Sequence, residues 1–141
     1  MQGAIGIHHI GIAVADLAVA TEQYRLLIGA VADHGEDSEA LGTRAVALRT
    51  PAGPMLELVA PFGDDTPVGR FLEKRGEGMH HIAYEVADIE AEVARLVAAG
   101  VEMVDVTPRL GLFGLQVAFI HPDAVYGVLL ELVQTGGIQH G

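Results

Sequence analysis

The sequence predicts an α+β fold built from two similar β-α-β-β-β modules, and three of its features lead to this prediction. The residues around His9 recur around His81, with isoleucine, valine, alanine and aspartate at matching positions. The segment Leu-Glu-Leu-Val at residues 56–59 recurs at residues 130–133. Each histidine segment is followed by an aspartate and then by apolar residues at helical spacing. Internal repetition of this kind indicates a duplicated structural unit.

The elements of the first module, residues 7–62, are expected from hydrophobic periodicity and turn residues. β-Branched residues between Gly6 and Asp16 predict the opening strand. Asp16 is then a suitable N-cap for a helix that ends at Gly29. The expected elements are a strand at 7–14, a helix at 17–29, an edge strand running into an exposed polar loop at 30–44, and strands at 45–49 and 55–59.

The second module, residues 79–134, repeats this order after a connector at residues 63–78. In the connector a short helix is expected before Gly76, and in the module Asp88 is the expected helix cap. We therefore expect residues 1–141 to form one domain. The expected elements of the second module are a strand at 80–86, a helix at 88–100, a strand at 101–106, a glycine-rich loop at 108–114, a strand at 115–120, a turn at 121–123 and a strand at 127–133.

Composition excludes several classes of function. The 141 residues contain no cysteine, which removes disulfides and thiolate chemistry. A formal net charge of −11 argues against binding nucleic acid or an anionic membrane surface. No apolar run approaches the ~20 residues of a membrane span, and no signal peptide is evident. These features predict a cytoplasmic protein whose ligand is a small molecule.

Four ionisable residues are expected on one side of four strands. Successive side chains of a strand point to opposite faces, so His9 and His81 lie opposite the bulky apolar residues of their own strands. Glu57 and Glu131 likewise lie opposite the leucines that flank them. Because the four positions are related by the duplication, they can converge on one point. Small residues beside the histidines leave space there: Gly11, Ala13 and Ala83.

Two imidazoles and two carboxylates form an N2O2 ligand set for a divalent metal. A single histidine on an apolar strand is more often a structural residue, but burial of a lone carboxylate is costly and demands a partner. The set suits cobalt, nickel, manganese, iron or zinc, and magnesium stays among the candidate ions. One or two positions on the ion would be left for water or substrate.

Three segments of the sequence resemble the methylmalonyl-CoA epimerase family of the vicinal oxygen chelate superfamily. They are His9-Ile-Gly-Ile-Ala-Val, the block at residues 65–86 that contains Gly-Glu-Gly-Met-His-His-Ile-Ala-Tyr-Glu-Val, and His121-Pro followed by Gly127-Val-Leu-Leu-Glu-Leu. The resemblance covers roughly residues 7–134, and its most specific part is the central block. It implies that the paired modules form a cupped mixed sheet, with a homodimer as the usual assembly.

The resemblance also implies a site and a mechanism. The metal ligands would be His9, Glu57, His81 and Glu131, the set that the repeat indicates independently. The substrate would be an acyl thioester of coenzyme A, epimerised by removal of the proton next to the thioester carbonyl through a metal-chelated enediolate. Glu131 would be the first candidate for the base and Glu57 the second.

The sequence departs from this family at the expected substrate pocket. Some epimerases carry a glutamate, proposed as a base, where this chain has Ala45. Phe113 and Tyr126 are bulkier than the residues usual at their positions, and a cationic rim that includes Arg109 could meet an anionic ligand. His121 could contact a ligand or stabilise its own turn. We therefore place substrate contacts at Ala45, Arg109, Phe113, His121 and Tyr126.

Two alternatives stay open on the sequence alone. A glyoxalase-type lyase or isomerase, or a divergent enzyme of secondary metabolism, would use the same ligand set, and the alanine at position 45 favours this interpretation. A non-catalytic binding protein is the other alternative. Retention of all four candidate ligands argues against it, because binding proteins of this superfamily generally lack them.

Overall fold

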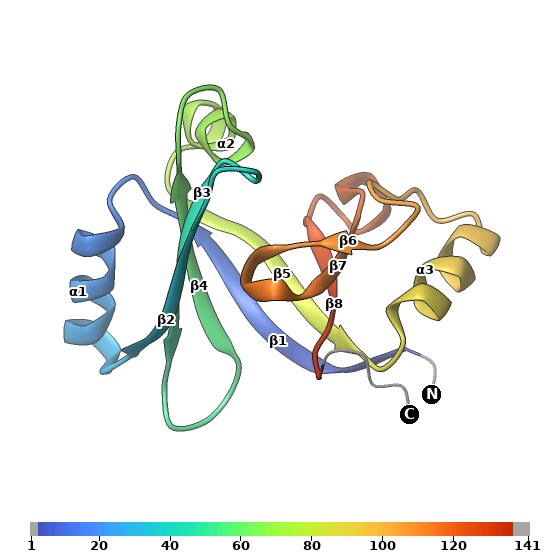
Figure 1. Cartoon of the computed structure of the whole chain (residues 1–141), viewed down its shortest axis with the longest axis horizontal. Coiled ribbons are helices and arrows are strands. Elements are labelled where there is room, and N and C mark those ends of the chain that lie inside the picture. The colour runs from blue at the N-terminus through green and yellow to red at the C-terminus, as the bar shows by residue number, and fades with distance from the viewer. Residues whose placement is uncertain (1–2, 137–141) are drawn as a thin grey trace. The chain divides into compact units, whose positions relative to one another are not determined.

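The computed structural model describes residues 3–136, which divide into two compact units (Figure 1). Residues 9–80 make up one unit, and residues 3–8 together with 81–136 make up the other. Each unit contains one of the predicted modules in the order β-α-β-β-β. The α+β class and the duplication are thus confirmed. Over the described residues, no helix has the length and apolar character needed to cross a membrane.

The unit of residues 9–80 holds four adjacent strands in the order β2-β3-β4-β1. Strand β1 pairs in parallel with β4, and β3 lies antiparallel between β4 and β2. Helix α1 packs against β3 and β4 (Figure 1). Their shared core is formed by Val14, Ala30, Leu48 and Leu58. The elements are β1 (Ala4–Ala13), α1 (Leu17–Ile28), β2 (Val31–Ser38), β3 (Thr43–Arg49), β4 (Met55–Pro61) and α2 (Pro67–Arg75).

Local signals in the sequence account for the ends of α1. The side chain of Asp16 accepts a hydrogen bond from the backbone N–H of Val19 at 3.1 Å, as expected of an N-cap. Gly29 ends the helix in the left-handed conformation, with φ of 70°, which glycine adopts without steric cost. The predicted helix at 17–29 is confirmed to within one residue.

The connector is joined to the first module by the glutamate of its Gly-Glu-Gly segment. The carboxylate of Glu77 accepts a hydrogen bond from the backbone N–H of Ala15 at 2.9 Å. Helix α2 begins at Pro67 after the N-cap Thr66, whose hydroxyl accepts from the N–H of Gly69 at 3.0 Å. The connector is therefore an ordered part of its unit.

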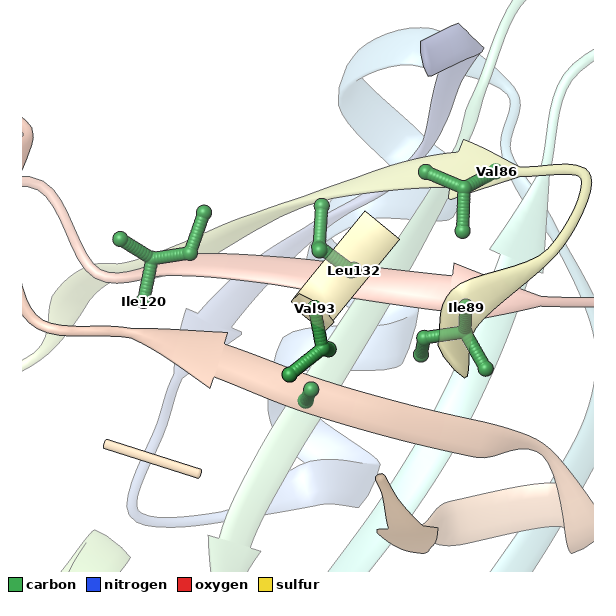
Figure 2. Close-up of a cluster of buried hydrophobic side chains, with 6 residues drawn as sticks. Val86, Ile89, Val93, Ile120 and Leu132 are labelled. Carbon is green, nitrogen blue, oxygen red and sulfur yellow. The ribbon is translucent and has the colours of Figure 1, made fainter. Parts of the chain in front are cut away.

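The other unit holds four adjacent strands in the order β5-β8-β7-β6. Strands β5 and β8 are parallel, whereas β7 is antiparallel to both β8 and β6. Helix α3 covers β7 and β8, and Val86, Ile89, Val93, Ile120 and Leu132 form the core between them (Figure 2). The elements are β5 (Gly78–Val86), α3 (Ile89–Ala98), β6 (Arg109–Leu110), η1 (Leu112–Gly114), β7 (Gln116–Ile120), η2 (Pro122–Ala124) and β8 (Leu130–Gln134).

The predicted strand at 101–106 is wrong. This segment forms a single antiparallel bridge, between Met103 and Ile120, and strand pairing resumes only at β6 inside the predicted glycine-rich loop. Val101 and Met103 nevertheless pack against the core beneath α3. Their apolar spacing reflects that burial and not a ladder of backbone hydrogen bonds.

Candidate metal centre and active site

In the unit of residues 9–80, His9 and Glu57 form a buried pair across two parallel strands. Gly11 of β1 is the partner of Glu57 in β4, and His9 lies two residues before Gly11 on the same face. The Nε2 atom of His9 is 3.3 Å from Oε2 of Glu57. The exposed fractions of the two residues are 4% and 6%.

The other unit repeats this geometry with His81 and Glu131. Ala83 of β5 is the partner of Glu131 in β8, and His81 again lies two residues earlier on the strand. The Nε2 atom of His81 is 3.2 Å from Oε1 of Glu131. The exposed fractions are 4% and 7%. We use the term histidine face for the sheet face that carries His9 and Glu57 in one unit and His81 and Glu131 in the other.

The donor atoms of each pair fit neighbouring ligands of one ion. Two ligand atoms that each lie ~2.1 Å from an ion are about 3.0–3.4 Å apart, in agreement with the separations of 3.3 Å and 3.2 Å. A charge-assisted hydrogen bond between the same groups would be shorter, at about 2.7–2.9 Å. Each His–Glu pair is therefore suited to hold a divalent cation.

The surroundings of the two glutamates differ. Glu57 lies between Gly11 and Ala47 on its sheet, so its two cross-strand partners have small side chains or none. Glu131 has Phe119 as its partner on β7, and the ring of Phe119 packs edge-on against the His81 ring at 6.0 Å between centroids. The apolar ring excludes water on one side of the second pair.

Arg109 is on the histidine face of the second unit. It is the partner of Val117 in the pairing of β6 with β7, and its guanidinium lies 5.5 Å from the centre of the Phe119 ring. Its Nε donates a hydrogen bond to Asp105 at 3.0 Å. Arg109 therefore places a positive charge, partly neutralised by Asp105, beside the Phe119 ring that packs against His81.

Of the other predicted substrate contacts, Phe113 is half-buried and Tyr126 is exposed, and both have left-handed backbone conformations with φ of 60° and 57°. His121 performs the turn-stabilising role, because its Nδ1 accepts a hydrogen bond from the backbone N–H of Asp123 at 3.0 Å. Ala45 is buried on β3, on the histidine face of the first unit and opposite Glu36 of β2.

Sequence reasoning missed two residues of this face, Phe119 and Glu36. The alternation within residues 115–120 places Phe119 on the same side as Val117, but only the register with β8 reveals Glu131 as its neighbour. Glu36 has no such signal, since an irregularity in β2 decides which way it points.

Comparison with known proteins places this chain in a family. Residues 8–119 match the model of the glyoxalase/bleomycin resistance protein/dioxygenase superfamily. The match covers more than half of the chain, and the chain belongs to this superfamily.

Within the superfamily, the chain is similar over most of its length to methylmalonyl-CoA epimerases. It is 38% identical over 130 residues to the ethylmalonyl-CoA/methylmalonyl-CoA epimerase of Cereibacter sphaeroides, covering 91% of this chain and 96% of that one. A structure of methylmalonyl-CoA epimerase with methylmalonyl-CoA and NH4+ matches with a TM-score of 0.90 and 36% identity, over 99% of this chain and 100% of that one. A glutamate-to-glutamine variant of the Streptomyces coelicolor epimerase, in complex with 2-nitronate-propionyl-CoA, matches with a TM-score of 0.90 and 37% identity over 96% and 100% of the two chains.

Proposed function

We propose that this protein is a divalent-metal-dependent epimerase of a 2-substituted malonyl-CoA-like thioester. The observation that carries the proposal is the pair of buried His–Glu contacts at equivalent positions of the duplicated modules. The similarity to epimerases of methylmalonyl-CoA supports the reaction and the substrate class. The complex of one relative with a nitronate analogue is consistent with a planar, anionic intermediate at the carbon that epimerises.

The proposed ligands of one ion are His9, Glu57, His81 and Glu131, two from each unit. Cobalt, manganese, nickel, zinc and magnesium are candidates for the ion, because the donor set of two imidazoles and two carboxylates accepts all of them. When bound, the ion would polarise the thioester carbonyl and so acidify the adjacent carbon.

The protein's own groups would move the proton. In the proposed reaction the carboxylate of Glu131 takes the proton from C2 of the substrate, and the electron pair of the broken C–H bond delocalises onto the thioester carbonyl oxygen. Return of a proton to the opposite face of C2 inverts the configuration. Glu57 is the second candidate for the base. Glu131 comes first because the apolar Phe119 ring beside this pair limits the access of water, which would otherwise compete with the substrate for the carboxylate.

Arg109 is the proposed partner for an anionic group of the substrate. Its exposed guanidinium lies on the histidine face above Phe119, so it can reach a carboxylate bound near His81. The negative charge of the chain as a whole, −11, makes such a local cation valuable for a polyanionic substrate.

The homodimer and the cytoplasmic location remain predictions. Sedimentation of the purified protein tests the first, and fractionation of cells tests the second.

Chiral analysis of methylmalonyl-CoA tests the proposed function. Purified protein is stripped with a chelator, reloaded with Co²⁺ or Mn²⁺ and incubated with a single epimer. We expect a racemic product with the reloaded protein and retained configuration with the stripped protein. Retained configuration with every ion, across the whole range of pH in which the protein is folded, would reject the activity.

Ala45 favours a second candidate, a glyoxalase-type isomerase acting on a glutathione hemithioacetal. Its methyl group cannot transfer a proton, whereas a four-ligand site with two histidines and two glutamates suits that reaction as well. Parallel assays with methylmalonyl-CoA and with the hemithioacetal of methylglyoxal discriminate between the two. Turnover of the hemithioacetal alone would establish the second candidate.

A further inference from the structure

Strand β2 contains a bulge that changes which of its side chains reach the histidine face. Ala32 pairs with Leu48, but the next pair along the strands joins His34 to Ala47. Asp33 is therefore an extra residue with no partner position of its own on β3. Bulges of this kind re-aim the side chains that follow them and are common next to active sites.

The bulge turns Glu36 toward the histidine face. With uninterrupted pairing Gly35 would face Ala45, and Glu36 would stand on the other side of the sheet. With the extra residue, Glu36 is the direct partner of Ala45. Directly opposed residues of antiparallel strands share a face. Since Ala45 and Ala47 share the face of Glu57, Glu36 does so as well.

Specific contacts hold the bulge in place. The carboxylate of Asp33 accepts a hydrogen bond from Nε of Arg49 at 3.0 Å and lies 2.8 Å from Nδ1 of His34. These neighbours lower the pKa of Asp33 below its ordinary value, His34 contributing most. Gly35 then lets the strands approach closely, because a side chain there would lie 3.1 Å from the carbonyl oxygen of Ala45. The register that aims Glu36 is thus built into the fold.

The strand residues that separate Glu36 from Glu57 on the histidine face have small side chains. Between Glu36 and Glu57 the strand residues on this face are Ala45 and Ala47, which project no more than a methyl group. On this face Glu36 is the direct partner of Ala45, and Glu57 is the direct partner of Ala47. Glu36 is half-buried, as a group that must meet both substrate and solvent should be.

We propose that Glu36 is the second proton-transfer residue of the epimerisation, standing on β2 in place of a carboxylate at position 45. This inference rests on the proposed function. In one direction the carboxylic acid of Glu36 gives its proton to C2 while a carboxylate of the ligand set holds the proton removed from the other face. In the reverse direction the Glu36 carboxylate takes the proton from C2. Each turnover leaves one acid and one carboxylate, which re-equilibrate with solvent.

Isotope exchange with Glu36→Gln tests the assignment. The substitution keeps the size of the side chain and removes its ability to transfer a proton. We expect epimerisation to fall by about 10²–10⁴-fold, the range of general acid–base catalysis. Exchange of the C2 proton with D₂O should persist for one epimer, with its configuration retained, because the other carboxylate still serves that face. The other epimer should not exchange.

Two further variants complete the experiment. Asp37→Asn removes the same charge from the next residue, which faces the opposite side and lies 3.5 Å from Arg44, and its activity should stay within about twofold of wild type. The double variant Glu36→Ala with Ala45→Glu moves the carboxylate one strand along the same face. The double variant should epimerise at least about tenfold faster than Glu36→Ala alone. This comparison tests the role of a carboxylate at this place even if Glu36→Gln does not fold.

The outcomes separate the two proposals. The role of Glu36 would be overturned if Glu36→Gln epimerised at the wild-type rate, or if it lost exchange of the C2 proton equally with both epimers. Either result would leave the proposed function intact. Wild-type protein that neither epimerises nor exchanges methylmalonyl-CoA when loaded with metal would overturn the proposed function and this role with it.

Discussion

The two buried His–Glu pairs provide a matched comparison, Glu131→Gln against Glu57→Gln. The pairs have nearly the same geometry, with Nε2–Oε separations of 3.2 Å and 3.3 Å and similar burial. Each substitution keeps the volume and one ligand oxygen but removes the charge and the basicity. If Glu131 is the base, its variant should lose about 10²–10⁴-fold in epimerisation, which is about 2.7–5.5 kcal/mol of transition-state stabilisation.

The Glu57→Gln variant should keep more of the activity, because an amide oxygen can still bind a cation while the base stays in place. We expect a loss of no more than about tenfold. The assay is the rate of racemisation of one methylmalonyl-CoA epimer, with the metal content of both variants measured in the same samples. Equal losses in the two variants at equal metal content would refute the assignment of Glu131 as the base.

Three further predictions concern stability and substrate binding. Burial would raise the pKa of Glu92, but hydrogen bonds from the Arg95 side chain and the backbone N–H of Gly3 lower it below its ordinary 4.5. Because the pKa of Glu92 is lower in the folded state, its contribution to the free energy of unfolding is present above pH 4.5 and is lost as the pH falls through the folded pKa. In urea unfolding, Glu92→Gln should be about 1–3 kcal/mol less stable than wild type at pH 7. This difference in stability should shrink in acid. Leu132→Ala should lower the free energy of unfolding by about 2–5 kcal/mol, because Leu132 is 5% exposed in the core of Figure 2; a loss below about 1 kcal/mol would show that this cluster is not a packed core. If the Arg109 guanidinium binds substrate and transition state equally, Arg109→Ala should raise KM for the thioester by about tenfold with little change in kcat. An unchanged KM would exclude Arg109 as the partner of the substrate anion.

The candidate ligands could be predicted from the sequence because strand alternation has a fixed period. Once His9 and His81 are aligned by the repeat, the face of each follows from its bulky neighbours, and the glutamates of the closing strands follow in the same way. The Asp16 cap and the Gly29 terminus were predictable for a similar reason, since each is a local steric or hydrogen-bonding preference.

Features that depend on register could not be predicted. A single extra residue at Asp33 reverses the direction of every later side chain in β2, and no local pattern distinguishes this strand from a regular one. The neighbourhood of Phe119 and Glu131 depends on how β7 lies against β8. The mistaken strand at 101–106 has the related cause that apolar residues can pack on a core from an irregular segment.

Metal stoichiometry tests the central claim most directly, namely that the two His–Glu pairs serve one ion. Titration of chelator-stripped protein with Co²⁺ or Mn²⁺, with bound metal measured after dialysis, should give one ion per chain. His9→Ala and His81→Ala should each abolish tight binding, although the two histidines belong to different units. Two ions per chain, no ion, or an ion that survives the loss of either histidine would contradict a single shared centre.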